Sequence, residues 1–484
     1  MPLPNCGIEP ATAFDAASAI LAVKAGQVEG DLSRGKPKRF SHISPASEPL
    51  QFRLMPFKIE KLIYGGDGLA RLPGDEHGPG KSVFVPFVLE GEQVEATVVE
   101  NKPGFARARL DAVLNVSPAR IQPGCPYFQR CGGCHYQHTS YENQLAIKSA
   151  ILRETLKRTA KIELACELQI HPSPEWNYRN RTRLKVHSAP EFALGYYKFR
   201  SHELLPVKEC PISSPLINRA IEALWSKGHS GEFPETVREV EVFADDTDST
   251  LLIEIYCQAG ASAEAAEQAC DALRQLFPEI KGVAAFEQPR AGQLAEPKRL
   301  CSAGDDSLPY QVGEFGYRVS AGAFFQVNRF LSQELVQTVT QATSGQVALD
   351  LYAGGGLFSQ AMAKSFPQVI AVESSQTSHS DLRHNVPPEV KAVRATTEQF
   401  LGKAWGPRPD FIVADPPRGG LGENVVRNLL KLSAPRIAYV SCDPSTLARD
   451  LRTLVSSGYR IEGAHLIDLF PQTFHIESVF HLAR

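Results

Sequence analysis

The chain has 484 residues, of which 43% are hydrophobic and 22% are charged, a composition typical of globular proteins and not of disordered chains. It is too long for one hydrophobic core, so about three domains are expected. Because the sequence shows neither a signal peptide nor an apolar run of the ~18 residues that cross a membrane, we expect a cytoplasmic protein without membrane contact.

Charge is distributed unevenly along the chain. The net charge is −3, but residues 101–208 hold 17 Lys and Arg against 8 Asp and Glu, so this segment carries +9 and the remainder −12. A local basic segment can bind nucleic-acid phosphates even when the whole protein is acidic. A basic face that is merely solvated explains the charge equally well.

The first segment, residues 1–54, mixes Ala, Ser, Pro and charged residues without a sustained period. We expect it to be a poorly ordered tail, or Met55 to be the true first residue. In either case no chemistry is expected there.

Residues 55–112 alternate short apolar stretches with turn signals, and strands are expected at 82–88 and 93–99. This spacing predicts a small barrel of the oligonucleotide-binding type. The segment resembles a TRAM domain, an RNA-binding barrel, at three short stretches: Tyr64-Gly-Gly-Asp-Gly-Leu-Ala, Val83-Phe-Val-Pro and Glu90-Gly-Glu. A small barrel with no role in RNA binding is the alternative.

Residues 113–320 are expected to form a central domain of mixed helix and strand. The spacing of apolar residues predicts a helix over 141–159 and strands at 181–186 and 250–258. Basic and aromatic residues interleave in Trp176-Asn-Tyr-Arg-Asn-Arg-Thr-Arg183. RNA contacts require such a pattern, because aromatic rings stack on bases and basic side chains neutralise phosphates. A strand with one solvated face is the competing interpretation.

Four cysteines of this segment have the spacing of metal ligands. Three fall within ten residues around a Gly-Gly turn and the fourth is remote: Cys125, Cys131, Cys134 and Cys210. Four thiolates suit zinc or an iron–sulfur cluster, and spacing alone does not separate the two. Unrelated buried cysteines are the alternative.

Residues 321–484 alternate strands and helices, with strands expected at 347–353, 368–374, 391–395, 410–415, 436–442, 461–469 and 477–483. Such alternation predicts an α/β fold with a doubly wound parallel sheet, in which the last two strands form a hairpin.

A cofactor pocket is expected where the first of these strands ends. Asp350 and Tyr352 lead into a Gly354-Gly-Gly356 turn, and the next strand ends in Glu373. A carboxylate at that position can accept hydrogen bonds from ribose hydroxyls. The two features favour a cofactor that contains a nucleoside, without identifying it.

Reactive residues are expected at the ends of later strands. Asp415-Pro-Pro-Arg418 follows the fourth strand, Cys442 ends the fifth, and Glu477 opens the last. A single cysteine at a strand end is more often inert packing, but the polar turn that follows Cys442 favours a reactive thiol. Glu477 could be a general base or a solvated glutamate.

Taken together, these segments resemble the RNA uracil-5-methyltransferase family, in the branch with a TRAM domain and an iron–sulfur site that includes 23S rRNA (uracil-5-)-methyltransferases. Three motifs carry the resemblance: Asp415-Pro-Pro-Arg-x-Gly, Tyr439-x-Ser-Cys442 and Asp468-x-Phe-Pro-Gln-Thr-x-His-x-Glu477. It implies a class I methyltransferase domain at 321–484.

The resemblance also implies roles for individual residues. Cys442 would be the nucleophile and Glu477 the proton-abstracting base. S-adenosylmethionine would be bound by Gln326, Tyr352, Glu373 and Asp415, and a [4Fe–4S] cluster by the four cysteines. Leu357 departs from the Asn or Thr common after the glycine turn in this family. The partner would be structured RNA, rRNA in preference to tRNA, and the enzyme a monomer.

Alternative functions make different demands on the residues of the expected site. A cytosine-5-methyltransferase would carry a second cysteine where Asp415-Pro-Pro-Arg418 stands. A catalytically inactive RNA-binding factor would not need both Cys442 and Glu477, and a redox sensor would not need a cofactor pocket. Relatives with the same domains act on tRNA, so a tRNA substrate stays an alternative.

Overall fold

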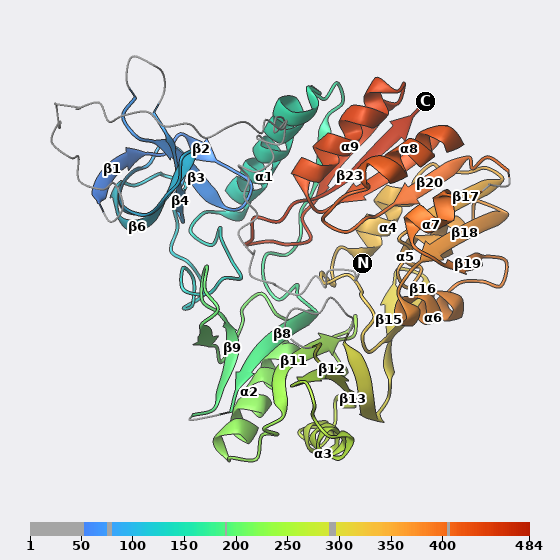
Figure 1. Cartoon of the computed structure of the whole chain (residues 1–484), viewed down its shortest axis with the longest axis horizontal. Helices are drawn as coiled ribbons and strands as arrows, with labels where there is room; N and C mark the ends of the chain where they lie inside the picture. The colour runs from blue at the N-terminus through green and yellow to red at the C-terminus, as the bar shows by residue number, and fades with distance from the viewer. Residues whose placement is uncertain (1–52, 75–79, 189–190, 290–296, 404–406) are drawn as a thin grey trace, which may run out of the picture. The chain divides into compact units, whose positions relative to one another are not determined.

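A computed structural model of the chain describes residues 53–74, 80–188, 191–289, 297–403 and 407–484 (Figure 1). The expected tail, residues 1–54, lies almost entirely outside this range. Its described residues form two compact units, one that ends at Arg120 and one that runs from Ile121 to Arg484.

The first unit contains, in its described residues, a six-stranded sheet of order β1-β5-β6-β4-β3-β2. Alternating side chains of β5, such as Val94, Ala96 and Val98, are fully buried in its core. The strands expected at 82–88 and 93–99 are confirmed as β4 and β5. The strands are β1 (Leu54–Lys58), β2 (Lys61–Leu62), β3 (Asp67–Arg71), β4 (Ser82–Pro86), β5 (Gln93–Asn101) and β6 (Phe105–Asn115).

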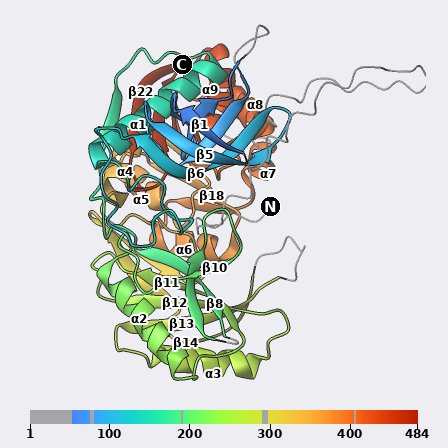
Figure 2. The same cartoon turned by 90° about the vertical axis from the view of Figure 1, so that its left-hand side faces the viewer.

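The second unit contains a seven-stranded sheet, the central sheet, whose order is β10-β9-β8-β11-β12-β13-β14 in the described chain. Helices α2 (Pro215–His229) and α3 (Ala263–Arg274) lie beside this sheet (Figure 2). Apolar side chains of both helices share one core with one face of it. The strands are β8 (Arg181–His187), β9 (Ala193–Tyr197), β10 (Leu204–Pro206), β11 (Val237–Ala244), β12 (Leu251–Cys257), β13 (Ile280–Glu287) and β14 (Lys298–Gly304).

The basic residues of β8 form internal ion pairs on the central sheet. Arg181 is buried, and its guanidinium contacts Glu241 and lies 2.6 Å from Glu254 Oε1. Arg183 Nε lies 2.6 Å from Glu241 Oε2, and its guanidinium covers the ring of Tyr256 at 3.8 Å. The expectation that Arg181 and Arg183 contact RNA is therefore wrong, because glutamates on neighbouring strands already neutralise them.

A larger sheet, the C-terminal sheet, has the order β19-β18-β17-β20-β21-β23-β22-β7 within the described residues. Strands on both sides of β17 run parallel to it, and β23 runs antiparallel to β21 and β22. The doubly wound sheet and its final hairpin are thus confirmed. The strands are β17 (Val347–Leu351), β18 (Gln368–Glu373), β19 (Lys391–Arg394), β20 (Phe411–Ala414), β21 (Arg436–Ser441), β22 (Arg460–Ile467) and β23 (Glu477–Ala483).

Helices flank the C-terminal sheet (Figure 1). They are α4 (Ser332–Thr340), α5 (Leu357–Met362), α6 (Gln376–Asn385), α7 (Thr397–Leu401), α8 (Gly422–Leu432) and α9 (Pro444–Ser456). Among the described helices, none is both long and apolar enough to cross a bilayer.

The edge strand β7 (Leu168–His171) comes from the segment expected in the central domain, and it pairs in parallel with β22. The expected helix before it is confirmed as α1 (Tyr141–Thr155), which continues as a π-helical turn over Leu156–Ala160. The hairpin of β15 (Ser307–Val312) and β16 (Phe315–Ser320) adds side chains to the core of the C-terminal sheet. Segments expected in the central domain therefore contribute a strand and core side chains to the C-terminal sheet.

The ion pairs of the central sheet predict a large effect of Glu254→Ala. This change removes a buried partner of Arg181 and the acceptor of the Tyr256 hydroxyl, so it should destabilise the protein by about 3–5 kcal/mol. Urea unfolding followed by circular dichroism measures the loss. As a control, Glu203→Ala removes an exposed ion pair with Lys198 and should leave the urea concentration at the midpoint of unfolding unchanged. If Glu254→Ala shifted this midpoint as little as the control does, the prediction would be wrong.

Candidate active site

The carboxyl ends of four parallel strands bring the expected site residues to one edge of the C-terminal sheet. Tyr352 follows β17, Glu373 ends β18, Asp415 follows β20 and Cys442 follows β21. In a doubly wound sheet this edge binds ligands, next to the strand where the winding direction reverses. That reversal lies between β17 and β20.

Cys442 and Glu477 are brought together by strand pairing. In the antiparallel pair of β21 and β23, Ser441 lies opposite Ser478, and the Ser478 hydroxyl donates to the Ser441 carbonyl at 3.3 Å. Continuing this register by one residue beyond the end of β21 would place Cys442 beside Glu477, which lies 35 positions further along the sequence.

The turn after Cys442 is rigid. Asp443 caps α9, and its carboxylate accepts hydrogen bonds from the amides of Ser445 at 2.8 Å and Thr446 at 3.0 Å. Pro444 occupies the first turn of the helix, where its missing N–H has no cost. Cys442 is half-buried and forms no disulfide. It directly precedes the capping residue of α9.

Glu477 is buried beside two charged residues. Burial raises the pKa of Glu477 well above its usual range, Asp415 raises it further, and Arg418 lowers it. Burial also raises the pKa of Asp415 to about 7. The carboxyl groups at this edge therefore hold protons more tightly than in water, and Arg418 is the group that draws Glu477 toward ionisation.

The loop that carries Asp415 and Arg418 is held by α9. The Thr446 hydroxyl donates to the Arg418 carbonyl at 3.0 Å, and Arg449 Nη2 donates to the Gly419 carbonyl at 2.8 Å. The same helix thus fixes the turn after Cys442 and the loop that faces Glu477.

Glu373 anchors the glycine turn. Its carboxylate accepts the amides of Gly354 at 2.9 Å and Ser375 at 2.6 Å. Gly354 and Gly356 have φ values of 55° and 91°, which favour glycine. Burial raises the pKa of Glu373, and the backbone hydrogen bonds oppose this. Leu357, the departure from the family pattern, packs into the hydrophobic core.

Tyr352 and Gln326, the other two residues expected to bind the cofactor, lie on different segments. Tyr352 has a positive φ of 64° between β17 and the glycine turn, and burial raises the pKa of its hydroxyl. Gln326 is half-buried on the segment between β16 and α4, where its backbone carbonyl accepts a hydrogen bond from Asn180 Nδ2 at 3.2 Å. Two residues on, Asn328 Nδ2 donates to the carbonyl of Leu469 at 3.1 Å, which ties this segment to the loop before Glu477.

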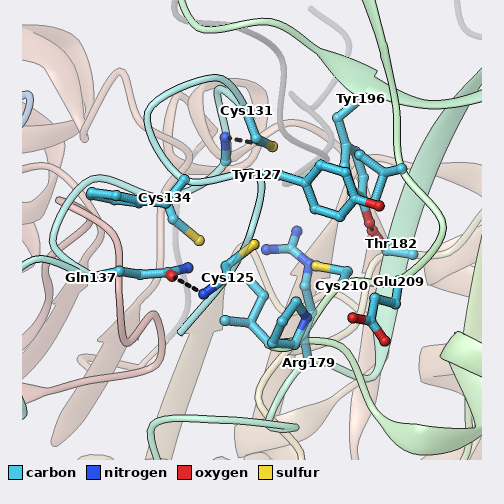
Figure 3. A pocket seen from close by; sticks show the side chains of 15 residues that line it. Cys125, Tyr127, Cys131, Cys134, Gln137, Arg179, Thr182, Tyr196, Glu209 and Cys210 are labelled. Atoms are coloured by element: carbon cyan, nitrogen blue, oxygen red, sulfur yellow. Dashed lines mark hydrogen bonds between the residues drawn. The ribbon is translucent and has the colours of Figure 1, made fainter. Parts of the chain in front are cut away.

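The four predicted cysteine ligands line one cavity, with their sulfur atoms gathered around it (Figure 3). Burial raises the pKa of Cys131 to about 12, and it also raises those of Cys125 and Cys134. Repulsion from Cys210 raises all three further. The buried Arg179 also lines the cavity and points into it (Figure 3).

This cavity does not have the geometry of a single-ion site. In the part of the chain that the structure describes, no group of three or more His, Cys, Asp or Glu side chains is arranged to hold one metal ion.

Sequence analysis missed the residues that hold the loop between β22 and β23, residues 468–476, which we call the Glu477 loop. Lys148 is fully buried in α1, and its Nζ lies 2.6 Å from Asp468 Oδ1. A signal was present, because Lys148 follows Leu145 by three positions and precedes Leu152 by four, which places a charge on the apolar stripe of a helix. Gln144, one turn before Lys148, was missed as well.

Comparisons with known proteins agree with one another. Residues 140–484 match the family model for tRNA (uracil-5-)-methyltransferases, and residues 51–110 match that for TRAM domains. An uncharacterized RNA methyltransferase of Aquifex aeolicus is 33% identical over 431 residues, which are 87% of this chain and 96% of that protein. One from Gloeobacter violaceus is 31% identical over 458 residues, 90% of this chain and 97% of that protein.

A similar solved structure is that of Pyrococcus abyssi tRNA (uracil-54, C5)-methyltransferase in complex with S-adenosyl-L-homocysteine. It has 23% identity and a TM-score of 0.69, and the match covers 89% of this chain and all of that one. At this identity the likeness concerns the fold, and it confirms the expected α/β methyltransferase fold.

Proposed function

We propose that this chain, which belongs to the tRNA (uracil-5-)-methyltransferase family, forms 5-methyluridine through a covalent bond to Cys442. We propose 23S ribosomal RNA as its substrate. Its family makes it an RNA (uracil-5-)-methyltransferase, and the methyl donor of the family is S-adenosylmethionine. The observation that supports the covalent mechanism is the register of β21 and β23, because its continuation by one residue would bring Cys442 beside Glu477.

The chemistry explains why a thiol is needed. Carbon 5 of uracil is a weak nucleophile, and attack of the Cys442 thiolate on carbon 6 makes carbon 5 electron-rich. Carbon 5 then accepts the methyl group, which S-adenosylmethionine supplies from its sulfonium. The target base must first leave its stack, at a cost of a few kcal/mol.

Glu477 would then complete the reaction. Its carboxylate takes the proton from carbon 5, and the electron pair of that C–H bond expels the Cys442 thiolate from carbon 6. A raised pKa suits a base that works near neutral pH, and burial and Asp415 provide it. Arg418 helps the carboxyl group to ionise before it acts.

Four residues would hold the cofactor. The Glu373 carboxylate ends β18, where it can accept hydrogen bonds from ribose hydroxyls, and Asp415 offers a carboxylate to the positive part of the ligand. Tyr352 and Gln326 would bind it from the adjacent segments. Leu357 would take no polar part, because its side chain is in the core.

The cysteine cavity would hold a [4Fe–4S] cluster. Four thiols around one cavity and the inward-pointing Arg179 fit a group that is ligated by thiolates and carries net negative charge. The cluster is preferred to zinc because the chain resembles the iron–sulfur branch of the family. Such a cluster, when bound, would join the segment of Cys125, Cys131 and Cys134 to Cys210.

Ribosomal RNA is proposed because the chain combines a TRAM domain with the four cysteines, as in the branch that it resembles. The TRAM unit would add RNA contacts outside the active site. The name of the matching family and the Pyrococcus abyssi enzyme favour tRNA as the second candidate.

Substitution of the two reacting residues separates their roles. Cys442→Ala should abolish both methylation and the covalent complex with 5-fluorouridine RNA, because no thiol is left to attack. Glu477→Gln should slow product formation about 10²–10⁴-fold, the usual contribution of a general base, yet still form that complex. Denaturing gels and transfer of labelled methyl groups measure both quantities. Loss of the complex in Glu477→Gln, or its retention in Cys442→Ala, would contradict these roles.

Metal analysis tests the cluster. The protein purified without oxygen should absorb broadly in the visible range and contain iron and acid-labile sulfide, and Cys210→Ser should lose both. Cys166→Ser is the matched control, because this cysteine is not among the residues that line the cavity. A colourless protein that contains zinc would refute the cluster.

Mapping of 5-methyluridine in cells with and without the gene tests the RNA. Loss from 23S rRNA alone supports the proposal, and loss from tRNA alone replaces it with the second candidate. If neither RNA changed, the proposed substrates would both be wrong.

A further inference from the structure

In the loop that leads into Glu477, four consecutive backbone carbonyls accept hydrogen bonds from other segments of the chain. We call the residues that hold the loop in this way the clamp. Asn328 Nδ2 donates to the carbonyl of Leu469 at 3.1 Å, and Lys148 Nζ to that of Phe470 at 2.9 Å. The Tyr178 hydroxyl donates to the carbonyl of Pro471 at 3.0 Å. The carbonyl of Gln472 accepts two backbone amides, those of His135 at 2.8 Å and Tyr136 at 3.0 Å.

From this arrangement we propose that Lys148, Gln144 and Gln472 are positioning residues that set Glu477 for proton abstraction. This proposal rests on the proposed function. It adds that the proton-abstracting step depends on α1 and on the segment directly after Cys134.

Lys148 is the charged element of the clamp. It is fully buried, and its ammonium group bonds both the Asp468 carboxylate at 2.6 Å and the Phe470 carbonyl. A buried lysine pays a desolvation penalty that only well-placed partners offset. Here both partners lie on the Glu477 loop, so the charge holds that loop rather than the helix that carries it.

Gln472 is the hub of the clamp. Its side-chain carbonyl accepts from Gln144 Nε2 at 2.9 Å, and its backbone amide donates to Gln144 Oε1 at 2.9 Å. Its Nε2 donates to Glu175 Oε2 at 2.9 Å. Gln472 also has a φ of 68°, a conformation that is uncommon outside glycine and needs such fixed partners.

The cysteine segment takes part directly. His135 and Tyr136 immediately follow Cys134, and their amides are the two that bind the Gln472 carbonyl. The path from the last cysteine of this segment to Glu477 therefore passes through one pair of hydrogen bonds and five residues of loop. A displacement of the cysteine segment would move the base.

The reaction chemistry gives this proposal a distinctive consequence. Attack by Cys442 and methylation of carbon 5 do not need Glu477, but release does, because the carbon-5 proton must leave before the C6–S bond breaks. A misplaced Glu477 should therefore leave the enzyme joined to methylated RNA. A merely destabilised protein would instead lose the complex and the product together.

The test uses unmodified RNA and full-length protein. Lys148→Met/Asp468→Asn removes the ammonium group without leaving a buried charge unpaired. Gln144→Ala breaks both bonds to Gln472, together with one local bond from Gln144 Nε2 to the Thr139 carbonyl at 3.2 Å. Both should lower the rate of product formation about 10- to 100-fold, as small misplacements do, and both should accumulate a covalent complex that contains methylated uridine. Lys157→Met, at an exposed ion pair, is the control and should match the parent.

Glu477→Gln must accumulate the same complex, because it lacks the base itself. If it does and the clamp variants do not, the positioning role is refuted while the proposed function stands. If Glu477→Gln accumulates none, the proposed mechanism fails. Parallel loss of complex and product in the clamp variants would mean that these residues only stabilise the fold.

Discussion

The antiparallel pairing of β23 between β21 and β22 is the constraint on which the site depends. Ser441 lies opposite Ser478, so each of these strands holds the position of the residue proposed for catalysis next to it, Cys442 or Glu477. A slip of one residue would turn Glu477 to the other face of the sheet. Pairing on both sides makes such a slip costly, because two ladders of hydrogen bonds and the buried side chains of β23 would all be misplaced. The proposed chemistry therefore depends on the same pairing that stabilises the fold.

The protein places its charges where water is excluded. On the central sheet, arginines and glutamates neutralise one another across strands. At the edge of the C-terminal sheet, burial instead leaves carboxyl groups with raised pKa values, as at Glu373, Asp415 and Glu477. The first arrangement pairs charges within the fold, whereas the second leaves carboxyl groups that hold protons more tightly than in water.

Sequence patterns predicted those parts of the fold that depend on local periodicity. The strands of the C-terminal sheet lie within about two residues of their expected positions, since each is a short apolar run between turns. The edge strand β7 was not predicted, because only its pairing with β22 makes it a strand. The interpretation of Arg181 and Arg183 as RNA contacts failed for a similar reason, since their glutamate partners lie more than 50 positions away. Lys148 was missed because its partner Asp468 is 320 residues distant.

The central claim is that the thiol of Cys442 bonds to the uracil ring next to the carbon that is methylated. Mass spectrometry of the complex trapped on 5-fluorouridine RNA tests this most directly, after digestion with protease and ribonuclease. The account predicts one modified peptide, in which Cys442 carries a fluorinated and methylated uridine. Attachment of the nucleotide to any other residue, or to Cys442 without the methyl group, would contradict it.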